Sequence, residues 1–72
     1  MYYADNNCTY TETYEPEHTY TFTGKCLTSG KEHSVTVNAS DLFKYRNGAY
    51  IQDAFADLSA GDREFLMSGM MW

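Results

Sequence analysis

The sequence predicts an α+β domain in which a three-stranded antiparallel β-meander is followed by two to three short α-helices packed on one face of the sheet. Two observations predict this class. Threonine alternates with larger side chains through residues 9–14 and 19–23, which is the period of a strand, whereas from residue 38 onward apolar residues recur at spacings of three and four, which is the period of a helix. The 72 residues allow a single domain, residues 1–72, with a modest core.

The strand assignments depend on composition as well as alternation. Both threonine segments contain only β-branched, aromatic and glutamate residues, and the first two of these classes favour strands. Pro16 cannot donate a ladder hydrogen bond and therefore predicts a turn between the two strands. A second turn at residues 28–31 leads to a third strand at residues 33–37.

The simplest registers place Tyr10 opposite Phe22 and Tyr14 opposite His18. In the second hairpin they place Gly24 opposite Val35 and Cys26 opposite His33. One face of the sheet is then expected to pack on the core: Cys8, Tyr10, Tyr14, Tyr20, Phe22, Cys26, Val35 and Val37. The other face carries hydroxyl groups: Thr9, Thr11, Thr13, Thr19, Thr21, Thr23, Ser34 and Thr36. This division predicts one buried and one solvated side of the sheet.

Capping residues predict the helix boundaries. Asn38 or Ser40 is expected to cap the first helix, which ends at the pair 47–48 (Asn-Gly). A second helix is expected through residues 50–58, and Ser59, with an acid three residues later, predicts the start of the last one. Gly69 is expected to close it. Helices of two or three turns are unstable alone, so they are predicted to pack on the sheet or on one another.

The charge balance restricts the choice of partners. Ten acidic against five basic residues give a net charge of −5 and oppose direct binding to nucleic acid or to an anionic membrane. Asp5, Glu12, Glu15 and Glu17 lie in the first 24 residues, which contain no lysine or arginine. A partner is therefore expected to present a basic surface. The chain contains no apolar run of bilayer length and no signal-peptide pattern, so we expect a cytoplasmic protein.

Residues with catalytic or metal-binding chemistry are few. Cys8, Cys26, His18 and His33 are zinc-ligand types, but their spacings of seven and eight residues differ from those of zinc knuckles. The cysteines are diagonal in the expected register, so whether they are free thiols or a distorted disulfide stays open. No nucleophile-base set and no glycine-rich phosphate loop is recognisable. We expect no metal site, no cofactor and no enzymatic activity.

Large apolar side chains lie near both ends of the sequence. Tyr2, Tyr3 and Trp72 either fold back on the core or anchor an interface, because tyrosine and tryptophan are enriched at protein contacts. The threonine face is interpreted as a solvated sheet surface, since three short twisted strands offer little flat area for ordering ice.

Residues 24–69 resemble a group of short, largely uncharacterised phage and prophage proteins. The resemblance is carried by these segments: Gly24-Lys25-Cys26, residues 30–37 (Gly-Lys-Glu-His-Ser-Val-Thr-Val), Leu42-Phe43, Asn47-Gly48-Ala49, Ile51-Gln52, Ala54-Phe55, Leu58-Ser59, residues 62–66 (Asp-Arg-Glu-Phe-Leu) and Ser68-Gly69. In that group a cysteine-containing tail follows, which with the hairpin cysteine implies a zinc-ribbon-like site. Here Met70-Met71-Trp72 stands in its place, so the tail ligands are missing. The resemblance implies phage origin and a non-enzymatic accessory role.

The predicted function is a phage-type accessory protein that binds and inhibits a host protein or nucleoprotein complex, acting in the host cytoplasm as an anti-CRISPR protein or other partial DNA mimic. The expected partner-binding residues are Glu12, Tyr14, Glu15, Glu17, Tyr20 and Trp72. The alternatives are a small virion or assembly component that self-associates, with a homodimer left open, and a degenerate zinc-ribbon-like module.

Overall fold

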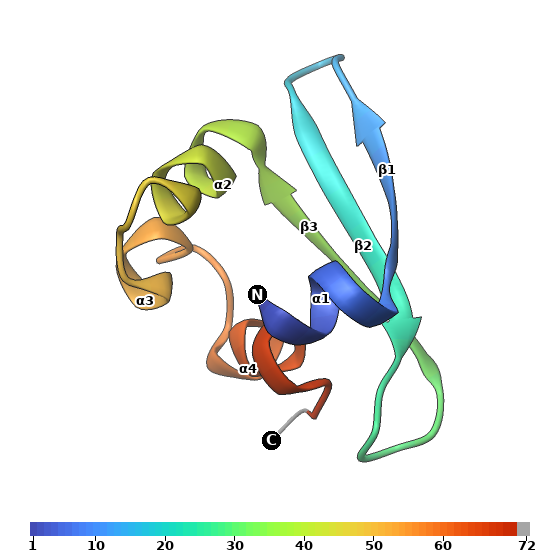
Figure 1. Cartoon of the computed structure of the whole chain (residues 1–72). Coiled ribbons are helices and arrows are strands. Elements are labelled where there is room, and N and C mark those ends of the chain that lie inside the picture. Colours follow the sequence, from blue (N-terminus) through green and yellow to red (C-terminus); the bar gives the residue numbers. More distant parts are fainter. Residues whose placement is uncertain (71–72) are drawn as a thin grey trace.

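The structure, a computed structural model, describes residues 1–70 and contains one antiparallel sheet with its helices on one face (Figure 1). The strand order is β1-β2-β3, so the strands form a meander. The α+β class predicted from the sequence is confirmed. The elements are α1 (Tyr2–Asn7), β1 (Thr9–Thr13), β2 (Thr19–Lys25), β3 (Glu32–Asn38), α2 (Ala39–Arg46), α3 (Ile51–Ala54) and α4 (Ala60–Ser68).

The first hairpin has the predicted register and the second does not. Tyr10 lies opposite Phe22 as expected, whereas Gly24 lies opposite His33 rather than Val35. The backbone N–H of Cys26 donates to the carbonyl of Lys31 at 2.8 Å, which pairs Cys26 with Lys31 instead of His33 and confines the loop to residues 27–30. Gly30 ends that loop at a φ of 74°. The shift of two residues leaves every side chain on its predicted face, because side chains in a strand alternate with a period of two.

The core lies between the sheet and the helices. Its largest fully buried side chains are Leu42, Phe55, Phe65 and Leu66, and the sheet contributes Phe22, Cys26, Val35 and Val37. The prediction that Tyr10 and Tyr14 also belong to the core was wrong. Both are exposed because β1 is an edge strand and its hairpin with β2 extends past the helices that cover β2 and β3 (Figure 1).

The predicted caps are present at two helices. The side chain of Asn38 accepts a hydrogen bond from the backbone N–H of Ser40 at 2.9 Å at the start of α2, and Ser59 accepts one from Asp62 at 3.1 Å at the start of α4. Gly69 closes α4 with a φ of 81°. These bonds satisfy N–H groups that have no partner inside the helix.

The second predicted helix is shorter than expected, since α3 is a single turn of four residues. Beyond it, Nη1 of Arg63 donates to the carbonyls of Phe55 and Leu58 at 3.1 and 2.9 Å. A side chain from α4 thus takes the place of the helical hydrogen bonds that would have continued α3.

Helix α1 was not predicted. It packs on α4, where Tyr3 meets the ring of Phe65 edge to face with centroids 5.6 Å apart, and its hydroxyl donates to the carbonyl of Lys25. Tyr3 therefore belongs to the core, whereas Tyr2 is exposed. Trp72, the other terminal aromatic, lies outside the described residues. No helix within residues 1–70 combines the length and the apolar character needed to cross a bilayer.

Candidate protein-binding surface

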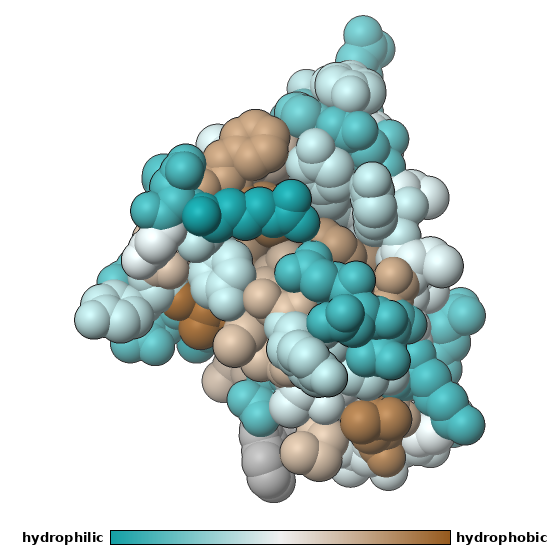
Figure 2. Space-filling model, viewed as in Figure 1, coloured by the Kyte–Doolittle hydropathy of each residue, from teal (hydrophilic) through white to brown (hydrophobic). Residues whose placement is uncertain are grey.

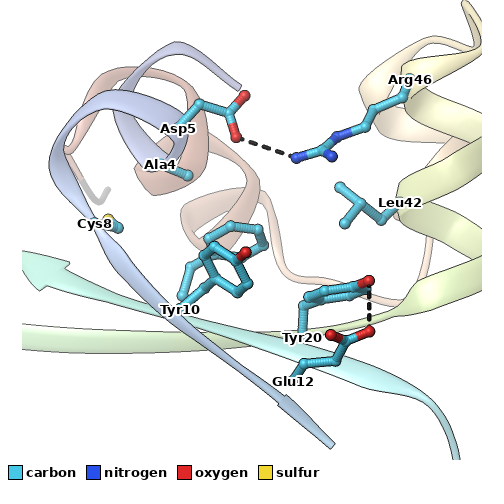
Figure 3. A pocket seen from close by; sticks show the side chains of 9 residues that line it. Ala4, Asp5, Cys8, Tyr10, Glu12, Tyr20, Leu42 and Arg46 are labelled. Carbon is cyan, nitrogen blue, oxygen red and sulfur yellow. Dashed lines mark hydrogen bonds and ion pairs between the residues drawn. The ribbon is translucent and has the colours of Figure 1, made fainter.

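A pocket of about 240 Å³ opens between the first hairpin, α1 and α2 (Figure 3). In the space-filling view, hydrophobic side chains lie in the hollow between helices and sheet and hydrophilic ones border it (Figure 2). The lining residues come from four elements and from the residue between α1 and β1: Ala4, Asp5, Cys8, Tyr10, Glu12, Tyr20, Phe22, Leu42 and Arg46.

The carboxylate of Glu12 is the centre of a hydrogen-bond network on the hairpin. Nε2 of His18 donates to Oε2 of Glu12 at 2.5 Å, and the hydroxyl of Tyr20 donates to the same oxygen at 2.8 Å. The β1–β2 register causes this convergence, because it places Glu12 directly opposite Tyr20 on the concave face. The network holds the carboxylate in a defined orientation at the edge of the pocket.

The network shifts the titration of its members. Hydrogen bonds from His18, then Tyr20, then Tyr14 lower the pKa of Glu12 below its ordinary value, because they stabilise the ionised carboxylate. The same bonds raise the pKa of Tyr20 and of Tyr14, since each phenol must keep its proton to donate it to Glu12. Glu12 is therefore an anion at neutral pH, and Tyr14 and Tyr20 are neutral donors to it.

Aromatic rings follow one another along the concave side of the hairpin, and we call this set the aromatic row. Tyr10 lies with its centroid 6.1 Å from Phe22 and 5.9 Å from Tyr20. His18 continues the row 5.2 Å from Tyr20, and Tyr14 stacks on His18 at 4.5 Å. These separations are typical of favourable ring pairs, so the row is a pre-ordered surface.

Much of this aromatic surface faces solvent. Tyr10 is 62% exposed, Tyr14 66%, and Phe43, whose ring lies 6.3 Å from that of His18, is 48% exposed. Phe43 belongs to α2, so the exposed aromatic surface extends from the hairpin onto the adjoining helix. Adjacent exposed aromatic residues of this kind are typical of interaction sites rather than of ordinary surface.

The side of the pocket opposite Glu12 carries an ion pair. Nη2 of Arg46 lies 3.4 Å from Oδ1 of Asp5 (Figure 3), and the two side chains are 55% and 46% exposed. An exposed pair with this separation contributes little to stability. Cys8 lies in the same part of the pocket, and burial raises the pKa of its thiol, which disfavours the reactive thiolate.

The predicted binding residues are partly brought together. Glu12, Tyr14 and Tyr20 meet in the hydrogen-bond network, while Glu15 and Glu17 lie exposed beyond them at the hairpin turn, where the Glu15–Pro16 peptide is cis. Trp72 is not among the described residues. Four residues of this surface were not predicted to bind a partner: Tyr10, which was assigned to the core, and Asp5, Arg46 and Phe43.

The other chemically interesting side chains do not assemble into a site. His33 pairs with Asp62 at 2.9 Å and packs on the ring of Phe65, so it serves the contact between β3 and α4. No disulfide joins Cys8 and Cys26, both within the described chain. Residues 1–70 contain no group of three or more histidine, cysteine or acidic side chains placed to hold a metal ion.

Comparison of the chain with protein-family models, with curated proteins and with solved structures finds no match. The resemblance to short phage proteins therefore stays a prediction, and the surface described above is interpreted from its own chemistry.

Proposed function

We propose that this chain is a non-catalytic binding protein that docks the concave side of its first hairpin, with the adjoining end of α2, on a basic surface of a partner protein. The observation that carries the proposal is the exposed aromatic row built around an ionised Glu12. Aromatic side chains dominate the energetic centres of protein interfaces, and here their positions are already set before binding.

Charge determines the kind of partner. The net charge of −5 and the concentration of acids in the first 24 residues favour encounter with a basic surface. Glu15 and Glu17 add two exposed carboxylates beyond the aromatic row. They would act mainly on the association rate, whereas the aromatic contacts would act on the lifetime of the complex.

The resemblance to phage proteins supports a narrower form of the proposal, in which the partner is a host protein or nucleoprotein complex that the chain inhibits, as an anti-CRISPR protein does. A DNA mimic needs several free carboxylates in the place of phosphates. Glu15 and Glu17 are exposed, but Glu17 accepts a hydrogen bond from Nδ2 of Asn38 at 3.5 Å, Glu12 accepts from His18, and Asp5 pairs with Arg46. DNA mimicry would therefore account for only part of the binding.

The test is affinity capture from an extract of the natural host and identification of the retained protein. The capture is then repeated with two pairs of variants that make the same change in charge. Glu15→Lys with Glu17→Lys changes the hairpin, whereas Asp53→Lys with Asp57→Lys makes the same charge change at exposed positions in and just after α3. We expect the hairpin pair to slow and reduce capture and the control pair to leave it intact. Equal capture by both pairs would refute the proposal.

A second matched pair tests the aromatic contribution. Tyr14→Ser removes an exposed ring from the hairpin, and Tyr50→Ser removes one that is 75% exposed next to α3. Only the first is expected to shorten the lifetime of the captured complex.

Self-association is the second candidate function. Strand β1 is an edge of the sheet and all five of its residues are exposed. It contains no lysine or proline, and Glu12 is its single charged residue, so little protects this edge from pairing. Sedimentation of the purified protein over a range of concentrations tests it. A monomer throughout would eliminate this candidate, whereas a dimer that Thr11→Lys dissociates would support it.

A further inference from the structure

We infer that the pocket between the first hairpin, α1 and α2 is a receptor for one arginine side chain of the partner. The inference rests on the proposed function and specifies the central contact of the interface. It is carried by three properties of the pocket: its size, its aromatic walls and the placement of its charges.

The pocket has the size of a single side chain. Its volume of about 240 Å³ is below the range of about 300–1,000 Å³ that is common for small-molecule sites. Tyr10 and Tyr20 line the pocket and also belong to the aromatic row, so the pocket and the row lie on the same side of the hairpin (Figure 3). A long side chain from a docked partner would therefore enter it without rearrangement of the backbone.

The walls match the two parts of an arginine. Phe22 and Leu42 are buried at 3% and 1% exposure and offer an apolar floor for the three methylene groups. Tyr10 and Tyr20, tilted at 57° to one another, both line the pocket, and a guanidinium plane can stack on a tyrosine ring. Stacking of this kind favours arginine over lysine, whose ammonium group is compact and strongly hydrated.

Carboxylates lie on two sides of these rings. Glu12 projects from β1 and Asp5 from α1, and Figure 3 shows them on opposite sides of the pocket. His18 and Tyr20 both donate to Oε2 of Glu12, so the ionised carboxylate offers its other oxygen as an oriented acceptor. A planar guanidinium can donate in several directions at once, which suits acceptors separated in this way.

The chain already places a guanidinium of its own at this rim. Among the pocket-lining residues of the described chain, Arg46 is the single cation, and its contact with Asp5 at 3.4 Å is exposed and weak. We interpret Arg46 as an internal competitor that partly neutralises Asp5 and that the partner's arginine must displace. Removal of Arg46 is then expected to strengthen binding rather than to weaken it.

The test titrates the isotope-labelled protein with three blocked tripeptides, acetyl-Gly-X-Gly-amide, in which X is arginine, lysine or citrulline. Citrulline has nearly the shape of arginine but no charge. We expect the arginine peptide to shift the backbone NMR signals of Cys8, Tyr10 and Leu42 and to bind at least about fivefold more tightly than the other two. Equal affinities for the three peptides, or no shift at these residues, would overturn the inference.

Variants then test the charges. Arg46→Gln is expected to tighten binding of the arginine peptide by about twofold to fivefold, the range for loss of an exposed ion pair that competes with the ligand. Glu12→Gln and Asp5→Asn are expected to weaken it, with Asp57→Asn as the unaffected control. Weaker binding by Arg46→Gln would contradict the role given to that residue.

The two proposals fail in different ways. If the hairpin variants reduce partner capture but the arginine peptide does not occupy the pocket, the pocket inference is wrong and the binding function stands. If the peptide binds as expected but capture is indifferent to the hairpin variants, the pocket is an arginine receptor and the proposed mode of docking is wrong.

Discussion

Replacement of Gly69 by alanine is the most direct test of the packing that builds one wall of the pocket. The residue has a φ of 81°, and an added Cβ would lie 2.5 to 2.8 Å from three atoms of the Tyr3 ring. The left-handed backbone costs an alanine about 1–2 kcal/mol. Displacing a buried ring adds about 1–3 kcal/mol, so the expected loss in the free energy of unfolding is about 2–5 kcal/mol.

That loss is large for this chain, because a domain of this length is expected to be stable by about 4–11 kcal/mol at about 0.05–0.15 kcal/mol per residue. Urea unfolding followed by circular dichroism measures it. Gly48→Ala is the matched control, since Gly48 also has a positive φ, 107°, but an added Cβ would meet nothing within 4 Å. Gly48→Ala is therefore expected to lose only the roughly 1–2 kcal/mol that the left-handed backbone conformation costs an alanine.

A double-mutant cycle isolates the contact itself. In a Tyr3→Ala background the ring is gone, and Gly69→Ala should then cost no more than Gly48→Ala does. Equal losses in the free energy of unfolding for Gly69→Ala and Gly48→Ala, each in the otherwise unchanged protein, would refute this reasoning. That result would mean that α1 does not pack on α4, and the wall formed by Ala4, Asp5 and Cys8 would lose its support.

Four further predictions concern the hairpin and a helix cap. Gly24→Ala would bring a Cβ within 2.5 Å of the Cys8 sulfur, so urea unfolding should show a loss of about 1–3 kcal/mol in the free energy of unfolding. A second substitution, Cys8→Ala, should largely restore it. A loss that Cys8→Ala leaves unchanged would contradict the contact. Tyr20→Phe should raise the pKa of Glu12 toward its ordinary value of 4.5, measured from the side-chain carbonyl signal in NMR, and an unchanged titration would contradict the network. The folded pKa of Glu12 is lowered, so its contribution to the free energy of unfolding is present above pH 4.5 and is lost as pH falls through the folded pKa. The folded pKa of Tyr20 is raised, so its contribution is present below pH 10 and is lost as pH rises above that value. Glu12→Gln should remove the acid dependence and reduce the alkaline one in urea unfolding at several pH values, because burial and the neighbouring tyrosines also raise the pKa of Tyr20. Ser59→Ala should cost about 1 kcal/mol in the same assay, and a neutral effect would mean that the cap at α4 is replaced by water.

The fold class was predictable because its signals are local. Alternation of threonine with aromatic residues defines strands, and Asn38, Ser59 and Gly69 define helix ends through bonds to their near neighbours. The second-hairpin register was not predictable, since it depends on how tightly the loop closes at Gly30. Helix α1 has six residues with no periodic pattern and exists through its packing on α4, which is a tertiary effect.

The site was predictable to the extent that it lies on one hairpin. Glu12, Tyr14 and Tyr20 are close in sequence, and the correct register alone brings them together. The pair of Asp5 and Arg46 joins residues 41 positions apart and requires the placement of both α1 and α2. Contacts of that range carry no local sequence signal, which is why the pocket was missed although Glu12 and Tyr20 of its lining were predicted to bind a partner.

The exposed end of the hairpin is ordered by the same groups that we assign to binding, and this has a consequence for affinity. The stack of Tyr14 on His18 and the bonds to Glu12 are exposed, so each is weak in the free protein. A partner that covers them excludes water, and hydrogen bonds to a carboxylate strengthen as the local dielectric constant falls. Binding would therefore stabilise the network that orients Glu12, while the surface needs little reordering to bind. A hairpin that extends past its helices is suited to this role, because no covering element has to move before the partner reaches the aromatic row.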